Sequence, residues 1–342
     1  MIRFKKTIFY ISLFVSISCF SQQRVIATFG EPTYLEREMV RYEKDEESPA
    51  VVLFERGKNY VKIIDNRIRL VKEVHRKIKV FDPSKFEHGE VEIYYLKSKN
   101  SQEKIVKLEA VTHNGDRKIF VLGQAIYDID INESLGLKRF TFPDIKKGSI
   151  LEYTYNIESP YFADFGGWDF QGDLPKIYTE FNTEVTANYQ YKRALFGNQE
   201  LFLNEVSIKE NCFSIPSSSS VADCEVALYA MKDVPKFKEE PHMLSKKNYL
   251  ARVTYELSHT IDFNGEKERF TKNWNDVERE FKHELPIGIQ LGSKTYFKDN
   301  IPANILAIED PLEKATSIYY FIQNRMTWNG SNGIFSDFNV KK

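Results

Sequence analysis

The sequence lacks an excess of charge of either sign. Lysine and arginine total 48 against 49 aspartates and glutamates, which gives a net charge of −1. No whole-chain basic field therefore exists to attract nucleic acid or an anionic membrane. Long hydrophobic runs are also missing, because the longest, residues 8–20, is about a dozen residues, whereas a bilayer-spanning helix needs about 20. We expect no nucleic-acid partner and no transmembrane span in the mature protein.

Motifs for phosphate and metal chemistry are absent. No GxxxxGK or GxGxxG sequence occurs, and none of the six histidines has the four-residue spacing of a zinc-binding helix. Asp128, Asp130 and Asn132 imitate the start of a calcium loop. However, Glu133 stands where glycine is needed and Arg139 where the bidentate glutamate belongs. The sequence therefore predicts no catalytic residue, no cofactor and no metal site.

Cysteine is scarce, with three residues in the whole chain. Cys19 lies in the N-terminal apolar run, which leaves Cys212 and Cys224, twelve positions apart in a polar, serine-rich stretch. In an exported protein a disulfide between them is permitted, and it would contribute on the order of 3 kcal/mol in the chain-entropy model. Two unpaired thiols on neighbouring strands are the alternative. Neither reading favours a thiol nucleophile, since Cys224 does not begin a helix that would lower its pKa.

The N-terminus is typical of a signal peptide. Three basic residues precede the apolar run, and the small-residue rule places cleavage after Ser21. Removal of residues 1–21 leaves 45 basic against 49 acidic residues, a net charge of −4. The sequence thus predicts export to the periplasm or cell surface. Lipid anchoring at Cys19 is a weaker alternative, because Ser16 stands where a lipoprotein signal has an apolar residue.

Between about Tyr42 and Ile261 the dominant hydrophobic period is two. In residues 67–80 the apolar side chains fall on one face and the basic ones on the other, and we interpret the basic face as solvent-exposed. Residues 151–158 alternate in the same way, with Glu152 on the polar face. Such alternation is typical of strands that bury one face against a core.

Turn residues separate these candidate strands. Asn114-Gly115 is the best candidate for a two-residue hairpin turn, because that turn requires positive φ. Many short strands punctuated by turns are typical of antiparallel sheets packed together. The fold class predicted for residues 22–262 is therefore mainly β, an antiparallel β-sandwich.

The pattern becomes helical after about Asn264. Asn273 can cap a helix that Pro286 ends, and Asp310 can cap a second helix that begins at Pro311. One face of the second helix carries the apolar residues Leu312, Ala315, Ile318, Tyr319, Ile322 and Met326. The residues that follow contain too little apolar material to cover this face. We therefore expect residues 263–342 to be the start of an incomplete domain.

Several segments occur in a combination that is specific, although each alone is weak: SPAVVL (48–53), RKIKV (76–80), LEAVTHNG (108–115), FTFPDIKKGSILEY (140–153) and WDFQ (168–171). In this order and spacing the chain resembles the domain of unknown function 3857, which in exported bacterial proteins precedes a transglutaminase-like domain. The second helix, followed by Thr327-Trp328-Asn329-Gly330, resembles the opening of that second domain. The resemblance implies a papain-like α+β domain whose Cys, His and Asp positions would lie after residue 342, so none is assigned here.

One cluster in the middle of the chain contains the residue types of a ligand site. Carboxylates lie beside aromatic residues, as a sugar site requires. Its members are Tyr161, Asp164, Trp168, Asp169 and Asp173. The alternative is a turn whose aromatic side chains join two sheets, in which Gly166-Gly167 makes room for the indole.

Three functional hypotheses follow from the sequence. The first is an exported, non-catalytic scaffold or binding module, the N-terminal part of a transglutaminase-like protein. The second is the N-terminal fragment of a thiol-dependent peptidase or transamidase. The third is a carbohydrate- or peptide-binding module. In each case the partner is an unidentified protein, peptide or glycan outside the cytoplasm.

Overall fold

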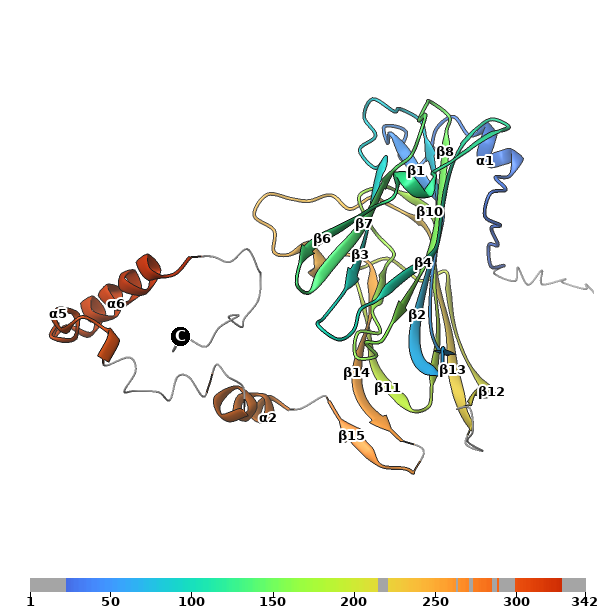
Figure 1. Ribbon diagram of the computed structural model, residues 1–342. Helices are drawn as coiled ribbons and strands as arrows, with labels where there is room; N and C mark the ends of the chain where they lie inside the picture. The colour runs from blue at the N-terminus through green and yellow to red at the C-terminus, as the bar shows by residue number, and fades with distance from the viewer. Residues whose placement is uncertain are drawn as a thin grey trace, which may run out of the picture.

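The computed structural model describes residues 23–214, 221–262, 264–270, 273–284, 288 and 299–327. Strands dominate this part of the chain, which confirms the mainly β class (Figure 1). The strands are β1 (Ala50–Ile64), β2 (Arg67–Val80), β3 (Glu90–Leu96), β4 (Lys104–Asn114), β5 (Arg117–Phe120), β6 (Tyr127–Asn132), β7 (Leu135–Thr141), β8 (Ile150–Ser159), β9 (Gly167–Asp169), β10 (Lys176–Thr186), β11 (Tyr189–Phe196), β12 (Leu203–Ser214), β13 (Val221–Val234), β14 (Arg252–Ile261) and β15 (Lys267–Arg269). Two short 3-10 helices, η1 (Gly123–Ala125) and η2 (Lys246–Asn248), lie in the connections.

Eight strands form one large sheet, with the order β12-β13-β10-β1-β2-β8-β4-β5. Its described strand pairs are antiparallel except one, since β1 and β10 run parallel, with Val52 opposite Lys176. The expectation of purely antiparallel sheets is wrong at this pair. A parallel pair needs a long crossover connection, and residues 65–175 supply it.

A second layer packs on one face of the large sheet, which we call the inner face. It contains a four-stranded sheet, in which β14 pairs with β11, β15 and β9, and a three-stranded sheet with the order β3-β7-β6. Two buried cores result. The core against the four-stranded sheet includes Phe181, Met231 and Val253, and the core against the three-stranded sheet includes Ile78, Phe140 and Leu151.

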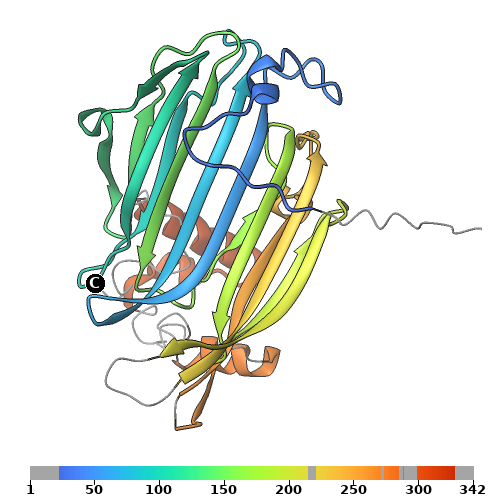
Figure 2. The same cartoon turned by 90° about the vertical axis from the view of Figure 1, so that its right-hand side faces the viewer.

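The N-terminal segment, residues 23–49, crosses the opposite, outer face of the large sheet (Figure 2, dark blue). It contains α1 (Tyr34–Glu38), which begins with a reciprocal capping box between Thr33 and Glu36. Small apolar clusters attach the segment to the sheet, one of them around Tyr42 and Leu53. The outer face is therefore covered by protein along this path.

This cover corrects two expectations from the sequence. The basic face of β2 is not solvent-exposed, because His75, Lys77 and Lys79 expose only 3%, 1% and 1% of their surface. Glu152, expected on the polar face of β8, exposes none. The N-terminal segment supplies hydrogen-bond partners that offset the free-energy cost of burying these groups. Lys79 Nζ, for example, donates to the Arg37 carbonyl at 2.7 Å.

The predicted hairpin is present, but its two-residue loop begins one position later than expected, at Gly115 instead of Asn114. Strands β4 and β5 pair with Asn114 opposite Arg117, so Gly115 and Asp116 form the two-residue loop. Gly115 has φ of 62°, the left-handed conformation that a glycine adopts without a steric penalty. A side chain at position 115 would meet no neighbouring atom, because nothing lies within 4 Å of a Cβ built there.

The predicted helix starts are confirmed as well. Helix α2 (Trp274–Arg279) begins with the Asn273 side chain accepting from Asp276 N, and it continues as the π-turn η3 (Glu280–Glu284). Helix α6 (Pro311–Arg325) begins with Asp310 accepting from Glu313 N at 2.7 Å, after the short α5 (Ala303–Leu306). Pro286, expected to end the first helix, lies outside the described residues.

The apolar stripe of α6 is largely exposed, with Leu312 at 76% and Tyr319 at 63% exposure. The expected signal peptide and residues 328–342, the expected continuation of the second domain, lie outside the described residues. Within the described part of the chain, no helix combines the length and apolarity needed to cross a membrane.

Candidate ligand-binding cleft

A cleft of about 590 Å³ opens on the inner face of the large sheet. Strands β1, β2, β8 and β10 contribute its floor, and β9, β14 and η2 contribute its sides. Two smaller cavities, of about 280 and 250 Å³, lie elsewhere. The volume of the cleft is within the range of small-molecule and peptide sites. Its chemistry is set by a charged floor, one tryptophan and an exposed rim.

The floor contains one carboxylate and two cations. Lys176 Nζ donates to Glu55 Oε2, and Arg76 Nε lies 3.3 Å from Glu55 Oε1. Glu55 and Lys176 expose only 6% and 4% of their surface, whereas the side chain of Arg76 exposes 24%. Burial alone would raise the pKa of Glu55, but Lys176 and Arg76 outweigh it and hold this pKa below its usual value. Glu55 is therefore ionised, and two basic side chains face this one carboxylate, although burial lowers the pKa of Lys176.

Trp168 on β9 is held by the same network. Its indole Nε1 donates to Thr179 Oγ1 at 2.9 Å, and that hydroxyl donates to Glu55 Oε2 at 3.2 Å. The indole also stacks on Phe181, with ring centroids 5.7 Å apart and planes 5° from parallel. Trp168 is half-buried and lines the cleft, so its position is fixed while part of its surface stays open to a ligand.

Gly57 provides the space for this indole. A Cβ built on Gly57 would lie 2.4 Å from two ring carbons of Trp168. Any side chain at position 57 would therefore move the tryptophan. This close approach links a residue of the large sheet directly to the geometry of the cleft.

The rim of the cleft is polar and exposed. Asp169, Asp173 and Lys246 lie there, with Lys246 Nζ 3.8 Å from the Asp173 carboxylate and 3.3 Å from that of Glu239. The Asp169 backbone carbonyl accepts from Lys176 Nζ at 3.0 Å, which joins the rim to the floor. His88 also lines the cleft, and burial together with the nearby charge of Arg76 lowers the pKa of its imidazole.

The structure brings together part of the cluster predicted from the sequence. Trp168, Asp169 and Asp173 line the cleft. Tyr161 and Asp164 do not: the Tyr161 hydroxyl donates to the Ser101 carbonyl at 2.8 Å, and Asp164 pairs with a lysine of β2 at 3.1 Å. The alternative reading also holds in part, since Trp168 joins two sheets by packing on Phe181.

Sequence reasoning missed the floor of the cleft. Arg76 lies at period two between Val74 and Ile78, which makes it a charged residue between two apolar side chains of the same face. A charged side chain at such a position costs free energy unless an opposite charge pairs with it. The placement of Arg76 was therefore the feature of the sequence that could have indicated the floor of the cleft. Its partner Glu55 is 21 positions away in the sequence, and Lys176, which binds the same carboxylate, is 100 positions away. Only the strand pairing places the three side chains together.

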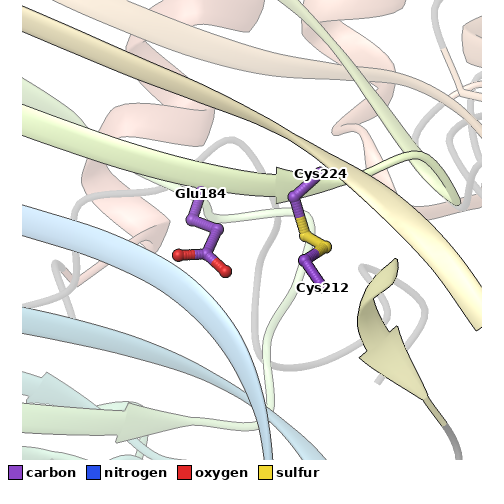
Figure 3. Close-up of side chains that lie close together, drawn as sticks. All are labelled: Glu184, Cys212 and Cys224. Atoms are coloured by element: carbon purple, nitrogen blue, oxygen red, sulfur yellow. A yellow bond between two sulfur atoms is a disulfide. The ribbon is translucent and has the colours of Figure 1, made fainter. Parts of the chain in front are cut away.

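The two cysteines of the described strands form a disulfide. Cys212 on β12 and Cys224 on β13 have Cα atoms 5.8 Å apart, and their sulfurs are bonded (Figure 3). The Glu184 carboxylate lies beside them, with the three potential ligand atoms within 4.8 Å of one another. Because the sulfurs are bonded to each other, neither is the thiolate that a metal site or a nucleophile needs. Of the two alternatives open from the sequence, the structure contains the bridge.

A second charged cluster lies on the outer face, beneath the N-terminal segment. Glu152 accepts from His75 Nε2 at 2.8 Å, from His113 Nε2 at 3.0 Å and from the Gly30 backbone at 2.9 Å. Burial alone would raise the pKa of Glu152, but these hydrogen bonds and the charge of Lys77 lower it to about 2. This cluster attaches the N-terminal segment to the sheet rather than facing a cavity.

Comparison with known proteins gives a fold likeness only. No family profile matches this chain, and no curated protein matches it. The chain is similar to the crystal structure of a candidate protease from Parabacteroides distasonis ATCC 8503, with a TM-score of 0.54 and 10% identity over 82% of this chain. It spans about half, 51%, of that protein's length. At this identity the likeness concerns the fold alone.

A lesser likeness is to aminopeptidase A of Legionella pneumophila, solved in complex with aspartic acid. The TM-score is 0.26 with 9% identity, over 75% of this chain and 28% of that one. A likeness of this size carries no argument about fold or function.

Proposed function

We propose that this chain is a non-catalytic binding module of an exported protein, and that it holds its ligand in the cleft beside Trp168. The observation that carries the proposal is the construction of the cleft. A buried ionic floor, Glu55 with Lys176, positions an aromatic side chain that stays half-open to the cavity. Buried charges held in a fixed geometry beside an open aromatic surface are typical of recognition sites.

Binding is favoured over acyl transfer by the residue types present. The described residues that line the cleft include no cysteine and no serine. The Cys212–Cys224 disulfide leaves no thiol on the described strands. Glu55 is occupied by two cations and a hydroxyl, which makes it a poor general base.

The test is a binding screen of the full chain against peptide and glycan arrays, followed by the Trp168→Ala variant. We expect Trp168→Ala to weaken binding of every array ligand by about tenfold or more, the loss typical of a central aromatic anchor. Trp274→Ala is the matched control, because Trp274 is 87% exposed on α2 and does not line the cleft.

Thermal unfolding of both variants separates lost binding from lost folding. Arrays without any ligand, or ligands whose affinity is unchanged in a folded Trp168→Ala protein, would contradict the proposal. Affinity lost equally in Trp274→Ala would place the site elsewhere.

A second candidate is that the module is the N-terminal part of a longer thiol-dependent peptidase or transamidase. The resemblance to the domain of unknown function 3857 supports it, as does the likeness to a candidate protease about twice as long as the matched region. The coding sequence after codon 342 discriminates, because this candidate requires Cys, His and Asp positions there in that order. In that case the cleft would present a substrate segment to the second domain.

A further inference from the structure

The cleft has an unbalanced positive charge at its base. Glu55 is the carboxylate of the floor, whereas Lys176 and Arg76 both point their charge toward it. The charged residues lining the cleft as a whole comprise four cations, Arg76, Lys176, Lys246 and Arg252, against three carboxylates. An excess of buried positive charge costs free energy unless an anion compensates it.

Arg76 is the cation that remains available. Its Nε lies 3.3 Å from Glu55 Oε1, its side chain also hydrogen-bonds that of Tyr153, and within the described residues no second carboxylate pairs with it. Its side chain is 24% exposed and lines the cleft beside Tyr153. A guanidinium presents its terminal nitrogens as a planar fork that matches a carboxylate. Lys176, by contrast, already donates to Glu55 and to the Asp169 carbonyl, and it exposes only 4% of its surface.

The acidic rim does not cancel this charge. Asp173 is compensated by Lys246, and both are exposed to solvent, where screening is strong. Asp169 is exposed; its carbonyl accepts from Lys176, and the charge of its carboxylate acts on that lysine rather than on Arg76. An anionic group inside the cleft is therefore attracted to Arg76 in surroundings of lower dielectric than those in which Asp169 and Asp173 repel it. The attraction is thus the less screened of the two interactions.

Strand β9 suggests what kind of molecule carries that anion. Among the described strands, β9 pairs only with β14, so one of its edges has no strand partner, although the Asp169 carbonyl already accepts from Lys176 Nζ. Its residues Gly167 and Asp169 are exposed, and all three of its residues line the cleft. An unpaired strand edge offers backbone donors and acceptors at the spacing of an extended peptide, which a sugar chain does not match.

We infer that the cleft binds an extended acidic peptide, which adds a strand to the open edge of β9 and places a carboxylate on Arg76. The inference rests on the proposed function, namely that the cleft holds a ligand. It goes further by naming the polymer, its charge and the residue that recognises it. Trp168, between the two contacts, would pack against the peptide.

The experiment uses the full chain and short fluorescent peptide pools of matched composition. One pool contains Asp and Glu, and the second has Asn and Gln in their place. Each pool is made with a free and with an amidated C-terminus, which separates side-chain carboxylates from the terminal one. A third version of the acidic pool carries N-methylated backbone amides, which cannot pair with a strand edge.

We expect the acidic pool to bind about tenfold or more tightly than the neutral pool, the effect of one charge-assisted hydrogen bond pair. Arg76→Gln leaves Lys176 to pair with Glu55 one to one, so it should remove this preference, and Arg76→Lys should keep part of it. N-methylation should abolish binding. Binding of the acidic pool that is retained after amidation supports the inference, because a side-chain carboxylate then occupies Arg76. Binding that is lost on amidation would assign the C-terminal carboxylate instead and would overturn it.

Arg252→Gln provides a second variant, should Arg76→Gln fail to fold, because Arg252 lines the cleft without belonging to the Glu55 network. It should lower the preference for the acidic pool by a smaller factor. Equal binding of the acidic and neutral pools, or of N-methylated and unmodified peptides, would overturn the inference. Binding of glycans alone that depends on Trp168 would overturn it too, yet leave the proposed function intact. Binding that is indifferent to Trp168→Ala would instead contradict the proposed function itself.

Discussion

Glu152 shows how much a single buried carboxylate can couple folding to pH. It exposes no surface and accepts hydrogen bonds from two histidines and the N-terminal segment. Its pKa is about 2 in the folded chain, against the usual value of 4.5. The unfolded chain therefore binds more protons between these pH values, so stability rises with pH across that window and is lost as pH falls through it.

The corresponding prediction concerns Glu152→Gln. The wild type should have a higher free energy of unfolding than Glu152→Gln at pH 5, and this difference should shrink by about 3 kcal/mol when the pH falls to 2. Only the wild type has a carboxylate at position 152 that is protonated in this range. Urea unfolding across this range measures it. Glu109→Gln, which changes an exposed carboxyl of β4, is the control and should differ little from the wild type at any pH. A wild-type advantage that stays constant with pH would contradict the assignment.

The buried polar residues of the outer face were predicted only in part from the hydrophobic pattern. Lys77, Lys79 and Glu152 obey the period-two pattern, which placed them on a polar face correctly. The sequence could not show that a segment more than 40 positions away covers that face. Arg76 was missed for the opposite reason, since it breaks the pattern and its partner Glu55 lies opposite it on the neighbouring strand β1.

At the scale of elements, local signals were sufficient where one residue determines the geometry. The cap at Asp310 and the glycine of the β4–β5 hairpin are of this kind. The turn between β1 and β2 was not predicted, although Asp65 and Asn66 both adopt positive φ there. Strand order and the parallel β1–β10 pair depend on long-range packing, which no local pattern encodes.

The β12–β13 pair carries the disulfide, and its contribution is measurable. The bridge closes a loop of 12 residues in the unfolded chain, so its removal should lower the free energy of unfolding by about 3 kcal/mol. Urea unfolding with and without a thiol reductant tests this. The Cys212→Ala/Cys224→Ala variant is the control, because the reductant should leave it unchanged. A wild type insensitive to reductant would contradict the stabilising role.

At the scale of the whole molecule, two layers create the cleft. The large sheet supplies the charged floor, and β9 of the four-stranded sheet supplies Trp168 and an open strand edge. Neither layer alone contains the site. The sequence identified the aromatic and acidic half, around Trp168, because those residues are neighbours in the chain. The basic half became visible only when the strands were assembled.

The central claim is that the cleft holds the ligand. The most direct measurement is a crystal structure of the full chain with the tightest-binding peptide of the acidic pool. We predict peptide density inside the cleft, with its backbone beside β9 and a carboxylate on Arg76. Peptide density on the outer face, on α6 or anywhere away from Trp168 would contradict it.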